Sequence, residues 1–194
     1  MITVIDDFLP EDEFKQLQTA MLGPDFPWYF MPTVSRPPGS YMPPGSMETP
    51  GFHHTFYSSI DNNKAYTIKI VGSLLDKINA HKNGQIDFIR VRASLKTQKR
   101  GFTDKHYNLP HVDYHFPHKS VVYYVSESDG DTWMFNEEFK QFPEPDVFTV
   151  KQRISPKPNR LLIFDGLCYH TASNPINSDS RIIININYVD KKLL

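Results

Sequence analysis

The feature that most constrains the fold is the order of two kinds of hydrophobic periodicity. Apolar residues recur at helical spacing around Phe14, Leu17 and Met21, and again from Asn63 to His81. From residue 86 onward, short apolar runs alternate with turn-rich pieces, and this pattern is typical of strands. The expected strands are Ile86–Thr97, Ser120–Ser126, Thr132–Asn136, Phe148–Val150, Arg160–Phe164 and Arg181–Val189. Without βαβ alternation, this order predicts a mainly β fold: an antiparallel barrel or sandwich with supporting helices.

Residues 23–51 interrupt this order, because they contain eight of the sixteen prolines and four glycines. Such a segment excludes a regular helix and a central strand. Its aromatic residues, among them Trp28 and Tyr29, favour an ordered flap that closes over a substrate; a mobile surface loop is the alternative. We therefore expect one domain over residues 1–194, with N-terminal helices and a Pro-rich flap in 1–85 and a β core in 86–190.

Charge and composition exclude several function classes. The net charge of −1 predicts no attraction to nucleic acid or to an anionic membrane. Lys96, Lys99 and Arg100 form a basic cluster that we interpret as a solvated loop. No apolar run approaches the roughly 20 residues that span a bilayer, and the N-terminus does not resemble a signal peptide. The single cysteine, Cys168, is typical of a cytoplasmic protein. The oligomeric state is not indicated.

The strand expected over Arg181–Val189 has two different faces. Alternate residues share a face of a strand, so one side is wholly apolar and the other carries Arg181, Asn185 and Asn187. That polar side could face water, or it could line a cavity. His170 ends the segment that starts with the apolar run Leu161–Phe164, and residues 173–180 resemble a loop. We therefore expect His170 and Arg181 to lie on hairpin partners and to point into one cavity.

A second pair of polar residues suits a metal ion. His111 and Asp113 share a face of an extended segment, and Pro110 and Pro117 exclude a long helix there. With His170 they would supply two imidazoles and one carboxylate, a set that suits divalent iron and leaves three coordination positions open. An arginine such as Arg181 suits the carboxylate of a small co-substrate.

A zinc hydrolase is the competing interpretation of the same segment. His111 and His115 are four residues apart, as in helical zinc-protease sites. Those sites need a helix and a Glu beside the first His, whereas residue 112 is Val. The sequence therefore favours the iron site over the zinc site.

The order of these motifs resembles the Fe(II)- and 2-oxoglutarate-dependent dioxygenases, in the prolyl-4-hydroxylase-like branch that includes small phage-encoded enzymes. The resemblance covers residues 86–190. One departure is that two residues, not one, separate Thr132 from Phe135 in the family's Gly-x-Thr-x-Phe element. The matching elements are His111-Val112-Asp113, Val121-Val122-Tyr123-Tyr124, Gly130–Phe135, Asn159–Phe164, His170 and Arg181-Ile182-Ile183.

The resemblance implies a double-stranded β-helix, which is a jelly-roll or cupin-like barrel, and it implies roles for the motif residues. His111, Asp113 and His170 would bind Fe(II). Arg181 would form a bidentate ion pair with the distal carboxylate of 2-oxoglutarate. O₂ would be the second co-substrate, and ascorbate is a candidate additional cofactor.

Two further residues would belong to the co-substrate pocket. Tyr124 matches the strand tyrosine that donates a hydrogen bond to the same carboxylate, and Tyr123 is the alternative if the register of the strand is reversed. Asn185 matches a polar pocket position four residues after the arginine.

The function implied is hydroxylation of an unactivated C–H bond, with release of succinate and CO₂. The substrate could be a prolyl residue of a peptide or a small molecule; no nucleic acid or membrane partner is expected. The alternative is a non-catalytic β-barrel binding module of the same fold.

Overall fold

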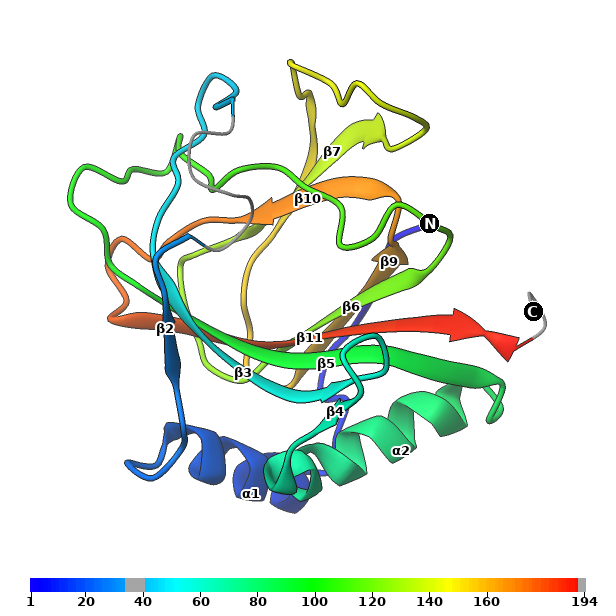
Figure 1. The fold of residues 1–194 in the computed structure, drawn as a ribbon. Helices are drawn as coiled ribbons and strands as arrows, with labels where there is room; N and C mark the ends of the chain where they lie inside the picture. The colour runs from blue at the N-terminus through cyan, green and yellow to red at the C-terminus, as the bar shows by residue number, and fades with distance from the viewer. Residues whose placement is uncertain (34–40, 192–194) are drawn as a thin grey trace.

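The structure, a computed structural model, describes residues 1–33 and 41–191 and consists mainly of antiparallel strands (Figure 1). Eight strands form the larger sheet, in the order β1-β9-β6-β11-β5-β3-β2, with β4 paired to β3. Their bounds are β1 (Thr3–Ile5), β2 (Tyr29–Met31), β3 (Gly51–Ser58), β4 (Asn63–Lys64), β5 (Ile86–Thr97), β6 (Lys119–Tyr124), β9 (Arg160–Asp165) and β11 (Ser180–Asp190).

A smaller sheet faces one side of the larger sheet, and helices cover the other side (Figure 1). The smaller sheet has the order β10-β7-β8, with β7 (Thr132–Glu138), β8 (Val150–Ile154) and β10 (Cys168–Ala172). The helices are α1 (Glu11–Leu22), the 3₁₀ helix η1 (Tyr66–Val71) and α2 (Gly72–His81). The predicted mainly β double-stranded β-helix is thus confirmed, although over the described residues the two sheets do not close into a barrel.

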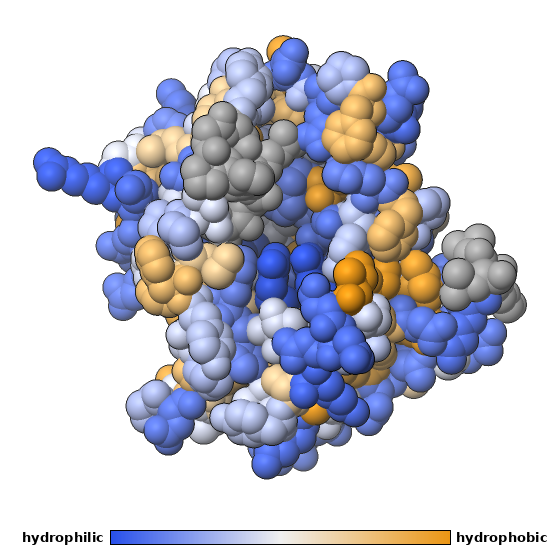
Figure 2. All heavy atoms as spheres, viewed as in Figure 1, coloured by the Kyte–Doolittle hydropathy of each residue, from blue (hydrophilic) through white to orange (hydrophobic). Residues whose placement is uncertain are grey.

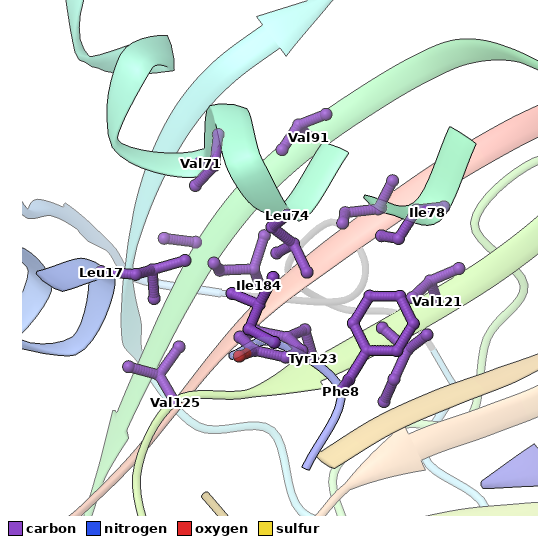
Figure 3. Packing of buried hydrophobic residues seen from close by; sticks show 14 of the residues in the cluster. Phe8, Leu17, Val71, Leu74, Ile78, Val91, Val121, Tyr123, Val125 and Ile184 are labelled. Carbon is purple, nitrogen blue, oxygen red and sulfur yellow. The ribbon is translucent and has the colours of Figure 1, made fainter. Parts of the chain in front are cut away.

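The helices bury their apolar stripes on the larger sheet. Figure 3 shows Leu17 of α1 and Leu74 of α2 among side chains of the central strands, such as Ile184 of β11. Leu74 and Ile184 are completely buried. Burying one such side chain contributes about 1.5–3 kcal/mol. This packing fixes the outer face of β5, β6 and β11, so that their alternate residues must point toward the smaller sheet.

The inner face of the larger sheet is apolar toward β9 and polar toward β5. Val122, Tyr124 and Leu162 pack with Met134 and Ile154 of the smaller sheet. Farther along the sheet, the inward positions of β5 and β11 carry arginine, lysine and asparagine side chains. Burying such residues is costly without polar partners, and several of them find partners in the site described below.

The second predicted helix begins later than expected. Residues 63–64 form β4, residues 66–71 form a 3₁₀ helix, and only Gly72–His81 is α-helical. The segment Tyr66–Val71 contains four β-branched residues, whose side chains disfavour an α-helix.

Both ends of the Pro-rich segment belong to the larger sheet rather than to a separate flap. β2 is an edge strand, where proline neighbours are tolerated, and β3, which we did not expect, lies between β2 and β5. Trp28 packs on Phe26 with ring centroids 4.7 Å apart, against the helix-facing core, and Tyr29 stacks on His54. The expectation that Trp28 and Tyr29 cover the substrate is therefore wrong. Residues 34–40 of this segment lie outside the described residues.

The expected hairpin between the His170 and Arg181 strands is also wrong. The segment from Leu161 to His170 forms two strands, β9 and β10, which belong to different sheets. β10 pairs with β7, whereas β11 pairs with β5 and β6. His170 and Arg181 consequently approach one another from opposite sheets.

None of the described helices has the length and apolar character needed to cross a bilayer. On the face shown in Figure 2, apolar residues lie in separate groups among polar ones.

Candidate metal and anion site

The three predicted metal ligands lie together between the two sheets. One ligand atom from each of His111, Asp113 and His170 falls within 4.8 Å of the others. His170 Nε2 is 3.7 Å from Asp113 Oδ2. The backbones of His111 and His170 exchange two hydrogen bonds of 3.0 Å, so the loop that follows Pro110 is attached to β10 as an isolated β-bridge. This bridge brings residues 59 positions apart into one cluster.

Backbone carbonyls set the tautomers of both histidines. His111 Nδ1 donates to the carbonyl of Leu109 at 3.0 Å, and His170 Nδ1 donates to that of Cys168 at 3.1 Å. Each Nε2 lone pair is then free for a metal, and such second hydrogen bonds also fix the ring orientation. Burial, reinforced by the neighbouring His170, lowers the pKa of His111 to about 4, so His111 is neutral at pH 7.

Four polar side chains surround the Asp113 carboxylate, whose side chain is 4% exposed. Arg90 donates to Oδ1 at 2.7 Å. Ser120, Asn187 and Asn185 donate to Oδ2 at 3.0, 2.8 and 3.3 Å. Burial by itself would raise the pKa of this carboxyl, but Arg90 and the other positive and donor groups hold it well below its usual range. The carboxylate is therefore ionised and fixed in place.

This donor set fits a divalent transition metal. Two imidazoles and one carboxylate converge, and all three residues line one cavity. The competing zinc arrangement is not formed, because residues 111–118 are not helical and His115 pairs with Glu144 at 3.4 Å.

Arg181 is buried beside this cluster, with 3% of its surface exposed. Its Nε donates to the Gly130 carbonyl at 2.7 Å, and its Nη2 donates to Thr132 Oγ1 at 2.8 Å. No carboxylate of the described residues lies within 4.0 Å of the guanidinium. Burial lowers the pKa of Arg181, but an arginine stays charged at neutral pH. A buried cation with unused donors is suited to bind an anion.

The two candidate tyrosines face opposite sides of β6. Tyr124 points toward the smaller sheet, where its hydroxyl is 2.7 Å from Thr132 Oγ1 and its ring lies 5.8 Å from the Arg181 guanidinium. Tyr123 points into the helix-facing core and donates to Asn159 at 2.7 Å. Of the two, only Tyr124 adjoins Arg181. Asn185 also lines the cavity, where it contacts Asp113.

A cavity of about 70 Å³ connects the metal cluster with Arg181. Its other lining residues include Arg92, Lys96 and His53. Lys96 is 7% exposed and donates to Thr49 at 3.2 Å, so its interpretation as part of a solvated loop is wrong. Burial, together with Arg181, lowers the pKa of Lys96 to about 7.

The polar side of β5 was not predicted from the sequence. Arg90, Arg92, Ser94 and Lys96 alternate with Val91 and Ala93, which pack in the helix-facing core. This is the same two-sided pattern that was recognised in residues 181–189. The same alternation of polar and apolar residues can be read from residues 90–96 of the sequence. It would have indicated that Arg90 points inward, where it could pair with the Asp113 carboxylate.

Gly130 tests how closely the backbone packs around the Arg181 side chain. A Cβ at this position would lie 2.8 Å from the Ser173 carbonyl oxygen and 3.0 Å from Arg181 Cδ. We expect Gly130→Ala to destabilise the protein by about 1–3 kcal/mol, as overpacking does, and to weaken anion binding at Arg181. Gly72→Ala is the matched control, because apart from its chain neighbours and its own helix backbone no atom lies within 4 Å of the added Cβ. Thermal unfolding of both variants measures the difference; equal melting temperatures would contradict the close fit.

Known proteins resemble this chain in structure but not in sequence. No protein-family model matches the chain, and no curated protein matches it in sequence. The chain resembles the structure of the epimerase SnoN in complex with Fe3+, alpha ketoglutarate and nogalamycin RO, with a TM-score of 0.61 and 10% identity. That match covers 97% of this chain and 78% of SnoN. The fold is that of the 2-oxoglutarate- and iron-dependent oxygenases.

Prolyl hydroxylases are among the other similar structures. A Pseudomonas putida prolyl-4-hydroxylase matches with a TM-score of 0.56 and 15% identity, over 97% of this chain and 92% of that enzyme. A Trichoplax adhaerens prolyl hydroxylase in complex with a hypoxia inducible factor peptide fragment matches with a TM-score of 0.55 and 16% identity. That match covers 98% of this chain and 84% of the hydroxylase. Proteins with this oxygenase fold thus include ones solved with small molecules and ones solved with peptides.

Proposed function

We propose that this chain is an Fe(II)- and 2-oxoglutarate-dependent oxygenase that hydroxylates an unactivated C–H bond and releases succinate and CO₂. The observation that supports this most strongly is the juxtaposition of the cluster of His111, Asp113 and His170 with the buried Arg181 across one cavity. A metal-binding cluster alone would suit many reactions, and the added anion site selects a co-substrate with a carboxylate.

In this proposal the residues divide into two groups. His111, Asp113 and His170 hold Fe(II) through two Nε2 atoms and a carboxylate oxygen, which leaves three coordination positions. Arg181 binds the distal carboxylate of 2-oxoglutarate. When bound with O₂, the iron and the keto acid supply the oxidising chemistry, and the protein supplies binding and orientation.

Two more residues have roles in this proposal, Tyr124 at the co-substrate and Asn185 at a metal ligand. Tyr124 donates a hydrogen bond to the same carboxylate as Arg181, because its hydroxyl and the guanidinium meet at Thr132. Asn185 holds Asp113 rather than the keto acid, since its amide lies 3.3 Å from the carboxylate.

The end of the Pro-rich segment is hydrogen-bonded to Lys96, which lines the cavity. The Met47 amide donates to the Tyr107 carbonyl at 2.8 Å, and Thr49 accepts a hydrogen bond from Lys96 and donates one to Asn174 at 2.9 Å. We propose that this part of the segment, rather than Trp28 and Tyr29, keeps water away from the site.

A groove of about 490 Å³ reaches His111 from the surface. Its walls are largely aromatic and proline side chains, including Tyr41 and Phe142, which are 58% and 63% exposed. We propose that the substrate, a small molecule or a peptide, approaches the metal through this groove.

The test is anaerobic addition of Fe(II) and 2-oxoglutarate to the purified protein. Chelation of iron by the keto acid should produce a weak visible charge-transfer band, and later admission of O₂ should yield succinate. A non-catalytic binding module of the same fold would give neither signal. If 2-oxoglutarate bound no more tightly with the metal than without it, the proposal would be wrong.

A further inference from the structure

We infer that Arg92 binds a negatively charged group of the substrate, a carboxylate or a phosphate, next to the metal site. This inference rests on the proposed function and narrows its substrate class to anions. It follows from the position of Arg92, from its lack of a partner and from the charges around it.

The strand register places Arg92 between the metal cluster and the side of the cavity formed by β3. On the inward face of the sheet, Arg92 pairs with Asn185 of β11 and with Thr55 of β3. The preceding inward residue of β5 is Arg90, which holds Asp113. Alternate residues of a strand are about 7 Å apart. Arg92 is therefore the next inward residue after the arginine that holds the metal ligand Asp113. Arg92 lines the cavity itself.

Arg92 lies apart from the proposed binding site of 2-oxoglutarate. Arg181 pairs with Lys96 in the register, four residues along β5 from Arg92, or about 13 Å. The contacts of Arg181 with Tyr124 and Thr132 also direct it toward β6 and β7, whereas Arg92 lies on the β3 side of β11. A keto acid held by the metal and Arg181 would therefore leave Arg92 free.

Arg92 has no counterion among the described residues. It forms no hydrogen bond or ion pair there, and its Nε is buried without a partner. Burial and the nearby Arg90 lower the pKa of Arg92 to about 10, so its charge persists at neutral pH. The desolvation of an unpaired charge costs several kcal/mol, and a bound anion would offset this cost.

The neighbouring groups do not supply that negative charge. Asp113 is already paired with Arg90 at 2.7 Å and would also bind the metal. His53, which pairs with Ser94 on the adjacent inward rung, is neutral, because burial and the charge of Arg92 lower its pKa to about 3. The planar fork of an arginine matches a carboxylate or a phosphate in a bidentate manner. The geometry therefore selects an anionic substrate.

Calorimetry on protein loaded with Zn(II) and saturated with 2-oxoglutarate tests this inference without turnover. The probes are acetate and inorganic phosphate, which separate the two kinds of anion, and acetamide serves as the neutral match of acetate. We expect acetate or phosphate to bind and acetamide not to bind. Arg92→Met should weaken binding of the anion by about 10–100-fold, the loss expected for charge-assisted hydrogen bonds. Arg100→Met, which removes an exposed arginine, is the matched control.

Three results would overturn the inference. They are equal binding of acetamide and both anions, unchanged anion binding by Arg92→Met, and anion binding that is seen without 2-oxoglutarate but is lost when 2-oxoglutarate saturates the protein. Arg92→Gln replaces Arg92→Met if the latter does not fold. If 2-oxoglutarate itself fails to bind the Zn(II) protein, the proposed function fails. The same anion titrations on the metal-free protein then still decide whether Arg92 is an anion site.

Discussion

Replacement of Asp113 by alanine should abolish tight metal binding and all 2-oxoglutarate-dependent turnover. The variant loses the only carboxylate of the cluster, and it leaves the Arg90 guanidinium, with 16% of its side chain exposed, without its counterion. Breaking such a pair costs about 3–5 kcal/mol, so we also expect a lower melting temperature for the metal-free variant. Isothermal titration with Fe(II) under anaerobic conditions and thermal unfolding measure the two effects.

Asp165→Asn is the control for this experiment. Asp165 also pairs with a cation, Lys119 at 2.8 Å, but its side chain is 40% exposed and belongs to no metal cluster among the described residues. This variant should bind Fe(II) with the wild-type affinity. Retention of wild-type metal affinity by Asp113→Ala would show that the metal binds elsewhere.

Replacement of Arg181 by methionine should weaken binding of 2-oxoglutarate by about 100-fold or more while metal binding persists. The methionine fills much of the same volume, but it removes the charge and the free donors of the guanidinium. Charge-assisted hydrogen bonds contribute about 1.5–3 kcal/mol each, and a carboxylate can accept two from one arginine. Titration of 2-oxoglutarate into the Zn(II)-loaded protein measures this loss.

Two variants separate a binding role of Arg181 from a structural one. Arg181→Lys keeps a positive charge but not the planar fork, so part of the affinity should return. Arg100→Met removes an exposed arginine that does not line the cavity, and it should bind 2-oxoglutarate normally. If Arg181→Met bound 2-oxoglutarate as tightly as the wild type, the guanidinium would not be the anion site.

The sequence predicted which three side chains lie together, but not the strand arrangement that brings them together. His111, Asp113 and His170 could be proposed because their residue types suit a metal and because a family pattern joins them. The route by which they meet was predicted wrongly, since His170 lies on a separate short strand after Gly166 that pairs with β7. Strand pairing depends on contacts between distant segments, and local periodicity does not carry that information.

Two elements show why local patterns fail. β3 contains His53 and His54 between apolar residues, so it shows no alternation of polar and apolar residues. His54 is nevertheless buried, because Pro27 and Thr67 satisfy its two ring nitrogens. On β5, Lys96 was interpreted as part of a solvated loop and Arg90 received no role, because the burial of both side chains depends on partners from other segments. In both cases tertiary contacts, not propensity, decide the environment.

The most direct measurement is the anomalous scattering of crystals grown with Mn(II) and 2-oxoglutarate. We predict one metal peak within about 2.0–2.3 Å of Nε2 of His111, Nε2 of His170 and an oxygen of Asp113, and a carboxylate of the keto acid bound to Arg181. A metal bound instead at His115 and Glu144, or a 2-oxoglutarate molecule that leaves Arg181 untouched, would contradict it.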